Sequence, residues 1–283
     1  MNVETHMSLP NQESLPSFDR PPVSEVALSV QFDKVPALRS FQLCTLWKQF
    51  SERFPKIEER PPLDPVVEQL KMGPQSHRIE FSLLQLPEVS RYFFITKSGN
   101  ELIQVQQDRF GHNWRKTGEG DEYPRYERIR EQFKENLEAF CEFLAAERLG
   151  RFAPTQADLT YVNHIVAGEG WEQFGEMHKV LNVQALQYSD SFLKEAESIS
   201  HSERHIIRTG DKPIGRLHIT AEPGYRIADK KPILNLTLVA RGYPLSGNID
   251  GVLSFLDLGR EYIVRGFASV TRPEMHKIWG RTK

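Results

Sequence analysis

The chain has 283 residues, of which 39% are hydrophobic, and its 36 basic and 38 acidic side chains give a formal charge of −2. This length suffices for one large or two small cores. A nearly neutral chain lacks the positive field that drives binding along a phosphate backbone. The sequence shows neither a membrane-spanning apolar run nor a signal-peptide pattern. Cys44 and Cys141 lie in helical patterns, which favours buried thiols over a disulfide. We therefore expect a cytoplasmic protein without membrane contact.

The first 22 residues mix Ser, Pro, Asn and Gln with isolated hydrophobic residues and show no period. Such a segment buries too little apolar surface to offset its ordering entropy, so we expect a disordered arm over residues 1–22. Val26, Leu28, Val30 and Phe32 then alternate with small or polar residues, which predicts a half-buried strand. Apolar side chains at spacings of three and four next predict an amphipathic helix that ends at Pro55.

Prolines recur from residue 56 to residue 74 and predict a loop with at most one short edge strand. Alternating side chains then predict a meander of three strands over residues 77–86, 91–97 and 101–107. Gly99 and Asn100 suit the hairpin between the last two strands, because both residues tolerate positive φ.

The stretch from Gln106 to Leu149 is the strongest local signal in the sequence. We interpret it as the end of a strand, then a polar turn, then a helix from about residue 125 to residue 149. The helix is predicted by one apolar stripe: Ile129, Phe133, Leu137, Phe140 and Leu144. Pro124 near its start and Gly150 at its end are typical of helix boundaries.

The same order returns after Gly150. The sequence predicts a strand over residues 159–166, then a short helix with Trp171, Phe174, His178 and Leu181 as its stripe. Further strands are predicted over residues 184–192, 198–208, 215–222 and 232–240, and a last helix over residues 248–269.

This order predicts an α+β fold made of two β-α-β(3-4)-α halves, over residues 23–150 and 151–283, the second with a C-terminal tail. Each half resembles a helix-grip unit, in which a curved antiparallel sheet wraps one long helix, and the TATA-binding protein contains a duplicated arrangement of this kind. The duplication is one of pattern, since the halves share little identity.

The predicted strands carry a second face that is polar and mostly uncharged. We expect this face to be touched by water or by a partner. Its members include Ser29, Gln31, Glu80, Ser82, Gln104, Gln106, Arg216, His218, Asn235 and Thr237.

Several segments resemble the signatures of a sporadically distributed bacterial protein family of unknown function. They are PPVSEVALSVQF at 21–32, QQDRFGHNWRK at 106–116, YPRYERI at 123–129, LTYVNHI at 159–165 and HKIWGR at 276–281. The resemblance covers nearly the whole chain but implies no established activity. The sporadic distribution implies a role on mobile elements or in defence against them, by analogy alone.

Sequence motifs for catalysis or cofactor binding are absent. The chain lacks a phosphate-binding loop, a dinucleotide fingerprint, a nucleophile elbow and an H-E-x-x-H helix. His201, Glu203 and His205 have a spacing that suits one face of a strand, and only His218 is near enough in sequence to complete a zinc site. We interpret them as a solvated strand face and expect no metal, no cofactor and no enzymatic activity.

The polar turn is the best candidate for partner binding, since Trp, Tyr and Arg dominate binding hot spots. The candidate residues are Arg109, Asn113, Trp114, Arg115, Lys116, Tyr123 and Arg125. The alternative is structural, with Trp114 filling the gap between sheet and helix. The sequence therefore favours a non-enzymatic protein that binds a macromolecule, preferably a protein. Nucleic-acid binding through the sheet faces and capture of a small molecule are the alternatives, and homo-oligomerisation is left open.

Overall fold

The computed structural model describes residues 14–70, 90–118, 120–183, 192 and 196–283. These residues form one antiparallel sheet of nine strands, in the order β2-β3-β4-β5-β1-β6-β9-β8-β7. The strands are β1 Val23–Phe32, β2 Lys56–Arg60, β3 Arg91–Ile95, β4 Glu101–Gln106, β5 Arg109–Arg115, β6 Pro154–Val166, β7 His201–Thr209, β8 Lys212–Tyr225 and β9 Pro232–Gly242. The helices are α1 Ser40–Phe50, α2 Tyr126–Ala146, α3 Met177–Val180, α4 Ile249–Val270 and α5 Pro273–Ile278, with a 3-10 turn at Phe174–Glu176. The predicted α+β class is confirmed.

The two predicted sheets are continuous with each other. β1 and β6 pair at the centre, with Val26 opposite Tyr161 and Leu28 opposite Leu159. Beyond β1 lie β5, β4, β3 and β2, and beyond β6 lie β9, β8 and β7. The sequence leaves open whether the two halves share a sheet, and the structure answers this question, because the first strands of the two halves form a long ladder together.

β5 corrects the interpretation of residues 109–115 as a polar turn. Phe110, His112 and Trp114 alternate and point toward the helices, where Phe110 stacks on Phe140 with ring centroids 5.0 Å apart. The hairpin at Gln107 and Asp108 sends this strand back along β4 and places it beside β1. Gly111 and His112 interrupt the apolar pattern, which is why the alternation is weak in the sequence.

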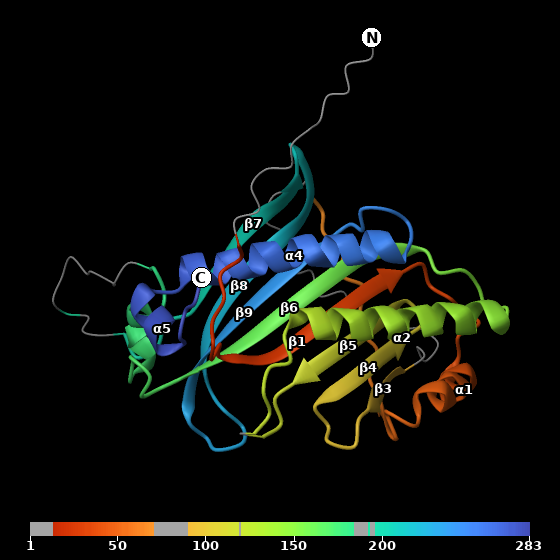
Figure 1. The fold of residues 1–283 in the computed structure, drawn as a ribbon, viewed down its shortest axis with the longest axis horizontal. Coiled ribbons are helices and arrows are strands. Elements are labelled where there is room, and N and C mark those ends of the chain that lie inside the picture. Colours follow the sequence, from red (N-terminus) through yellow and green to blue (C-terminus); the bar gives the residue numbers. More distant parts are fainter. Residues whose placement is uncertain (1–13, 71–89, 119, 184–191, 193–195) are drawn as a thin grey trace, which may run out of the picture.

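The long helices α2 and α4 lie side by side across the same face of the sheet (Figure 1). The predicted stripe of α2 is buried, since Ile129, Phe133, Leu137 and Phe140 are all 0% exposed. Burial of four such side chains is worth roughly 6 to 12 kcal/mol before entropy. In α4, a Cβ on Gly266 would lie 3.0 Å from Leu217, so this glycine allows the helix to approach β8 closely.

Residues 14–22 differ from the predicted disordered arm. Phe18 is buried and packs edge-on against Phe267, 5.4 Å between ring centroids, and it also contacts Trp279. Its backbone forms a bridge with Arg281, so the N-terminal segment and the C-terminal tail lie together. Residues 1–13 lie outside the described residues.

Some of the predicted segments fall partly or wholly outside the residues that the structure describes. The predicted strand over 77–86 and most of the one over 184–192 lie outside them. Both cysteines are free, but Cys44 is exposed because it lies on the solvent side of α1. Among the described helices, none is both long and apolar enough to cross a membrane.

Candidate functional site

The long helices α2 and α4 pack on one face of the sheet, and we call the opposite face the helix-free face (Figure 1). The register of the strands determines which side chains lie together on the helix-free face. Gln31 lies opposite Gln156, and Ser29 lies opposite Asp158. Arg241 lies opposite Asp158 on one side and Arg216 on the other. Of the ten residues predicted for the polar face, eight lie in described strands on this side. Glu80 and Ser82 lie outside the described residues.

An extended segment crosses the helix-free face, and we call residues 61–70 the strap. It contacts the strands in their order across the sheet. Leu63 bonds to Gln106 of β4, Asp64 to Arg109 of β5, and Val66 to Gln31 of β1. Glu68 then bonds to Gln156 of β6 and Arg216 of β8. Pro61, Pro62 and Pro65 favour this extended conformation.

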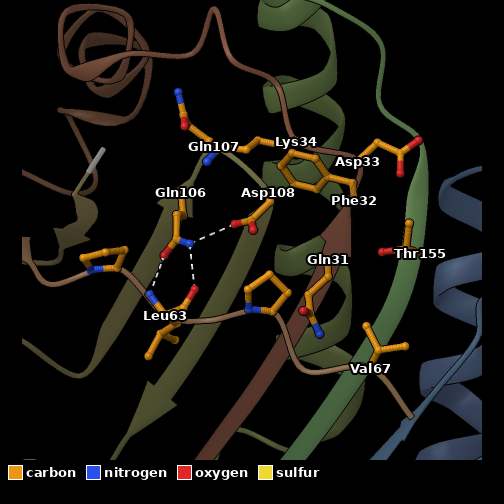
Figure 2. Close-up of a pocket in the computed structure, with 12 residues that line it drawn as sticks. Gln31, Phe32, Asp33, Lys34, Leu63, Val67, Gln106, Gln107, Asp108 and Thr155 are labelled. Atoms are coloured by element: carbon orange, nitrogen blue, oxygen red, sulfur yellow. Dashed lines mark hydrogen bonds between the residues drawn. The ribbon is translucent and has the colours of Figure 1, made fainter. Parts of the chain in front are cut away.

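Two glutamines hold the strap by its backbone. Gln31 donates from Nε2 to the carbonyl of Val66 at 2.9 Å, and its Oε1 accepts the amide N–H of the same residue at 3.0 Å. Gln106 does the same with Leu63, at 2.9 Å for both bonds, as Figure 2 shows. Each glutamine amide therefore makes the same two hydrogen bonds to the strap backbone that a residue of a neighbouring strand would make. The contact does not depend on which side chain the bound residue carries.

Gln156 is a third glutamine of the same kind, but its contact is half complete. Its Oε1 accepts the N–H of Glu68 at 3.3 Å, and the side chain is 1% exposed. Its Nε2 has no hydrogen-bond partner among the residues that the structure describes. An unpaired buried amide costs free energy, so this position is a poorly matched part of the strap's contact.

Glu68 is the one buried side chain of the strap, at 6% exposure, whereas Leu63, Val66 and Val67 are 38% to 55% exposed. Its carboxylate lies 2.6 Å from Nη1 of Arg216 and 2.5 Å from Nε2 of His218. Tyr243 donates its hydroxyl to the Glu68 carbonyl at 2.7 Å. Burial alone would raise the pKa of Glu68, but the hydrogen bonds from His218 and Arg216 outweigh it and lower the pKa.

A second buried carboxylate lies beside the strap. Asp158 of β6 pairs with Arg241 of β9, and it accepts weaker hydrogen bonds from Ser29 and Gln31 at 3.4 and 3.5 Å. Both partners of this pair belong to strands of the sheet, so release of the strap leaves the pair in place. The Glu68 pair has one partner on the strap and can separate by local release.

A cavity of about 290 Å³ opens between the strap and the end of β1 (Figure 2). It is lined by polar groups such as Gln31, Asp33 and Asp108, and by Leu63 and Val67 of the strap. The strap therefore does not fill the space above the sheet, and an occupant with larger side chains would find room there.

The predicted binding residues separate onto the two faces of β5. Arg109, Asn113 and Arg115 lie on the helix-free side. Arg109 donates to the carbonyl of Asp64 at 3.3 Å, Asn113 contacts Glu25 and Gln104, and Arg115 donates to the carbonyl of Gly99. Arg109 is thus part of the candidate site, Asn113 lies on the same face with its contacts to strand residues, and Arg115 fixes the β3–β4 hairpin.

The other predicted residues lie elsewhere. Trp114 is buried on the helix side and packs on Tyr123, and the Tyr123 hydroxyl lies 2.8 Å from that of Tyr161. Arg125 begins α2 with φ of 72° and donates to the carbonyl of Phe18. These residues join the helices to the sheet and the N-terminal segment. Lys116 is exposed beyond the end of β5.

The sequence analysis did not find Glu68, Gln156 or the Asp158–Arg241 pair. Gln156 and Asp158 lie just before residue 159, where the predicted strand begins. Extending the alternation of that strand toward the N-terminus would have placed both side chains on the polar face. Glu68 carries no such signal, because it lies in a segment without a periodic pattern of apolar and polar residues.

His201, Glu203 and His205 lie on the helix side of β7, with both imidazoles within 3.4 Å of the Glu203 carboxylate. His218 faces the opposite side of the sheet, since its strand partner is Arg204. Within the described ranges, no three His, Cys, Asp or Glu side chains are placed to hold a metal ion.

Comparison of the chain with protein-family models, curated proteins and solved structures gave no match. The family resemblance, the link to defence and the cytoplasmic location therefore remain predictions.

Proposed function

We propose that this protein is a non-enzymatic binding protein that holds an extended segment of a protein partner on its helix-free face. The observation that carries the proposal is the pair of two-point contacts from Gln31 and Gln106 to the strap backbone. A sheet surface that binds one extended chain through its main-chain groups can bind another by the same contacts.

A protein partner is favoured over nucleic acid by the charges on this face. Arg216 and Arg241 are both paired with buried carboxylates. Arg60, Arg91 and Arg109 lie near one another, and after burial it is the charges of Arg109 and Arg60 that lower the pKa of Arg91. Arg60 also pairs with Glu58. Three such cations do not make a track along a phosphate backbone.

Selection from a displayed library of random peptides tests the proposal. The selection is run on the wild-type protein and on Glu68→Gln, and we expect enriched peptides to bind at least one of them. Thr160→Trp, which fills the helix-free face beside Asp158, should abolish that binding, and Glu138→Trp on the solvent side of α2 should not. Enrichment on neither protein, or binding that survives Thr160→Trp, would remove the assignment.

We also propose that the two halves are duplicated helix-grip units. Support comes from the strand order, because in each half the first strand pairs with the last strand of its own meander, β1 with β5 and β6 with β9. A long helix follows each meander. The units would then share the face on which the strap lies.

Capture of a small molecule is the second candidate function. A cavity of about 520 Å³ lies between α4 and strands β7 and β8, lined by apolar Leu217 and Ile219 and by polar Tyr262 and Glu261. Its size and mixed lining suit a small ligand. Native mass spectrometry of the purified protein should then show a co-purifying compound, and a spectrum of the bare chain alone would exclude this candidate.

A further inference from the structure

The strap makes an incomplete set of contacts with the surface on which it lies. Gln31 and Gln106 each make two hydrogen bonds to it, but Gln156 makes one, although it is buried in line with them. The Nε2 group of Gln156 is orphaned among the described residues. An extended segment with a carbonyl placed to accept a hydrogen bond from this Nε2 group would complete a contact that the strap leaves unmade.

The strap is also weakly anchored by its own side chains. Leu63, Val66 and Val67 remain at least 38% exposed, so the strap buries little apolar surface. Its position depends on backbone hydrogen bonds and on the carboxylate of Glu68. Backbone bonds to the glutamines can be exchanged one for one with those of another extended chain, so displacement of the strap costs little if the new chain also supplies a carboxylate.

The surroundings of Glu68 define what that carboxylate must be. Arg216 presents Nη1 to one oxygen at 2.6 Å and His218 presents Nε2 to the other at 2.5 Å, so both oxygens are bound. Arg216 is 14% exposed and His218 26%, which strengthens these contacts relative to those in water. Removal of the carboxylate takes away the anion that pairs with Arg216 and leaves Arg216 only its bond to the Gln69 carbonyl as a contact with the strap that we describe, so a neutral side chain is a poor replacement for Glu68.

We propose that the strap is an internal occupant of a peptide-binding groove, and that the partner is an extended acidic segment that displaces it. Gln31, Gln106 and Gln156 bind the backbone of the segment, and Arg216 and His218 bind one acidic side chain. This inference rests on the proposed function and adds its regulation and the chemistry of its ligand. The groove is free for a partner only after the strap leaves.

The test uses the full chain and a fluorescein-labelled peptide with the strap sequence PPLDPVVEQL. The protein variant Glu68→Gln has a weakened strap, and we expect it to bind this peptide at least 10-fold more tightly than the wild type does. A peptide with Gln in place of its Glu should bind the variant at least 10-fold more weakly. Equal affinity for the wild type and the variant, or for the two peptides, would overturn the inference.

A second variant weakens the strap in a different way, so the test does not depend on the correct folding of Glu68→Gln alone. Val66→Pro removes the N–H that bonds to Gln31 and leaves Glu68 intact, so it should also raise peptide affinity. Adding Gln31→Ala to Glu68→Gln should weaken binding at least 10-fold. Gln104→Ala is the matched control, because Gln104 lies on the same face and bonds to Arg91 and Asn113, not to the strap.

The outcomes separate the two proposals. If library peptides bind the helix-free face but bind the wild type as well as Glu68→Gln, and do not need an acidic residue, the inference fails while the proposed function stands. If no peptide binds either protein, both fail. A dimer of Glu68→Gln that forms by exchange of straps would show that the occupant is a second copy of the chain, and this too overturns the inference.

Discussion

The side-chain amide of Gln31 bonds to both the N–H and the carbonyl of Val66, so a residue of a central strand fixes the middle of the strap. This contact joins two residues 35 positions apart. The strap is thereby oriented across the strands, with Leu63, Val66 and Val67 exposed and the side chain of Glu68 turned toward the sheet.

Gln31→Ala should release the centre of the strap without unfolding the sheet. Loss of two hydrogen bonds costs about 2 kcal/mol, which corresponds to about 30-fold faster exchange of the Val66 amide hydrogen. Hydrogen exchange followed by mass spectrometry of the segment over residues 61–70 measures this. Gln104→Ala should leave the exchange of that segment unchanged, and equal exchange in both variants would contradict the role given to Gln31.

Arg216→Ala and Arg241→Ala each remove the cationic partner of a buried carboxylate but should differ in their cost to stability. Asp158 cannot leave β6, so Arg241→Ala leaves an unpaired buried carboxylate and should lower the free energy of unfolding by about 3 to 5 kcal/mol. Glu68 can leave with the strap, which limits the cost of Arg216→Ala to less than about 1 kcal/mol of global stability.

Urea denaturation measures the free energy of unfolding of each variant. Limited proteolysis within residues 61–70 measures how readily the strap leaves the sheet. Arg216→Ala should be cleaved in the strap much faster than the wild type at nearly unchanged global stability. A similar global loss in both variants would mean that the strap is an integral part of the core.

His112 should make the protein sensitive to mild acid. Complete burial, and then the charge of Arg53, lower its pKa from 6.5 to about 3. Between these pH values the unfolded chain takes up a proton that the folded protein excludes. The free energy of unfolding therefore falls as pH falls, by about 1.4 kcal/mol per pH unit below about pH 6.

The comparison of His112→Gln with the wild type isolates this proton. Carboxylates contribute equally to both proteins, so the slope of stability against pH between pH 6 and pH 4 should be shallower by one proton in the variant. Identical slopes in the two proteins would show that the folded protein takes up a proton at His112 as readily as the unfolded chain does.

Trp114→Ala and Lys116→Ala separate packing from recognition in the stretch first singled out by the sequence. Trp114 is buried against Tyr123, so its removal should cost about 3 to 5 kcal/mol. Lys116 is exposed, and its removal should cost less than about 0.5 kcal/mol. Thermal unfolding measures both, and a small loss in Trp114→Ala would contradict its place in the core.

The sequence predicted the elements whose signals are periodic. The stripes of α2 and α4 and the alternation in β1, β8 and β9 led to the α+β class, and the polar positions Gln31, Gln106, Arg216 and His218 were expected on the second face. β5 was missed because glycine and histidine occupy two of its positions. The contact of the strap was missed because main-chain recognition by glutamine leaves no pattern in the recognised segment.

The ladder between β1 and β6 runs through the middle of the sheet, from the pair of Glu25 with Val162 to that of Gln31 with Gln156. A protein with separate lobes can close on a ligand by a hinge, but here the two halves share strands that are hydrogen-bonded along most of their length. The groove is therefore built into a continuous sheet before any partner arrives, and the proposed release of the strap requires no hinge between the two halves.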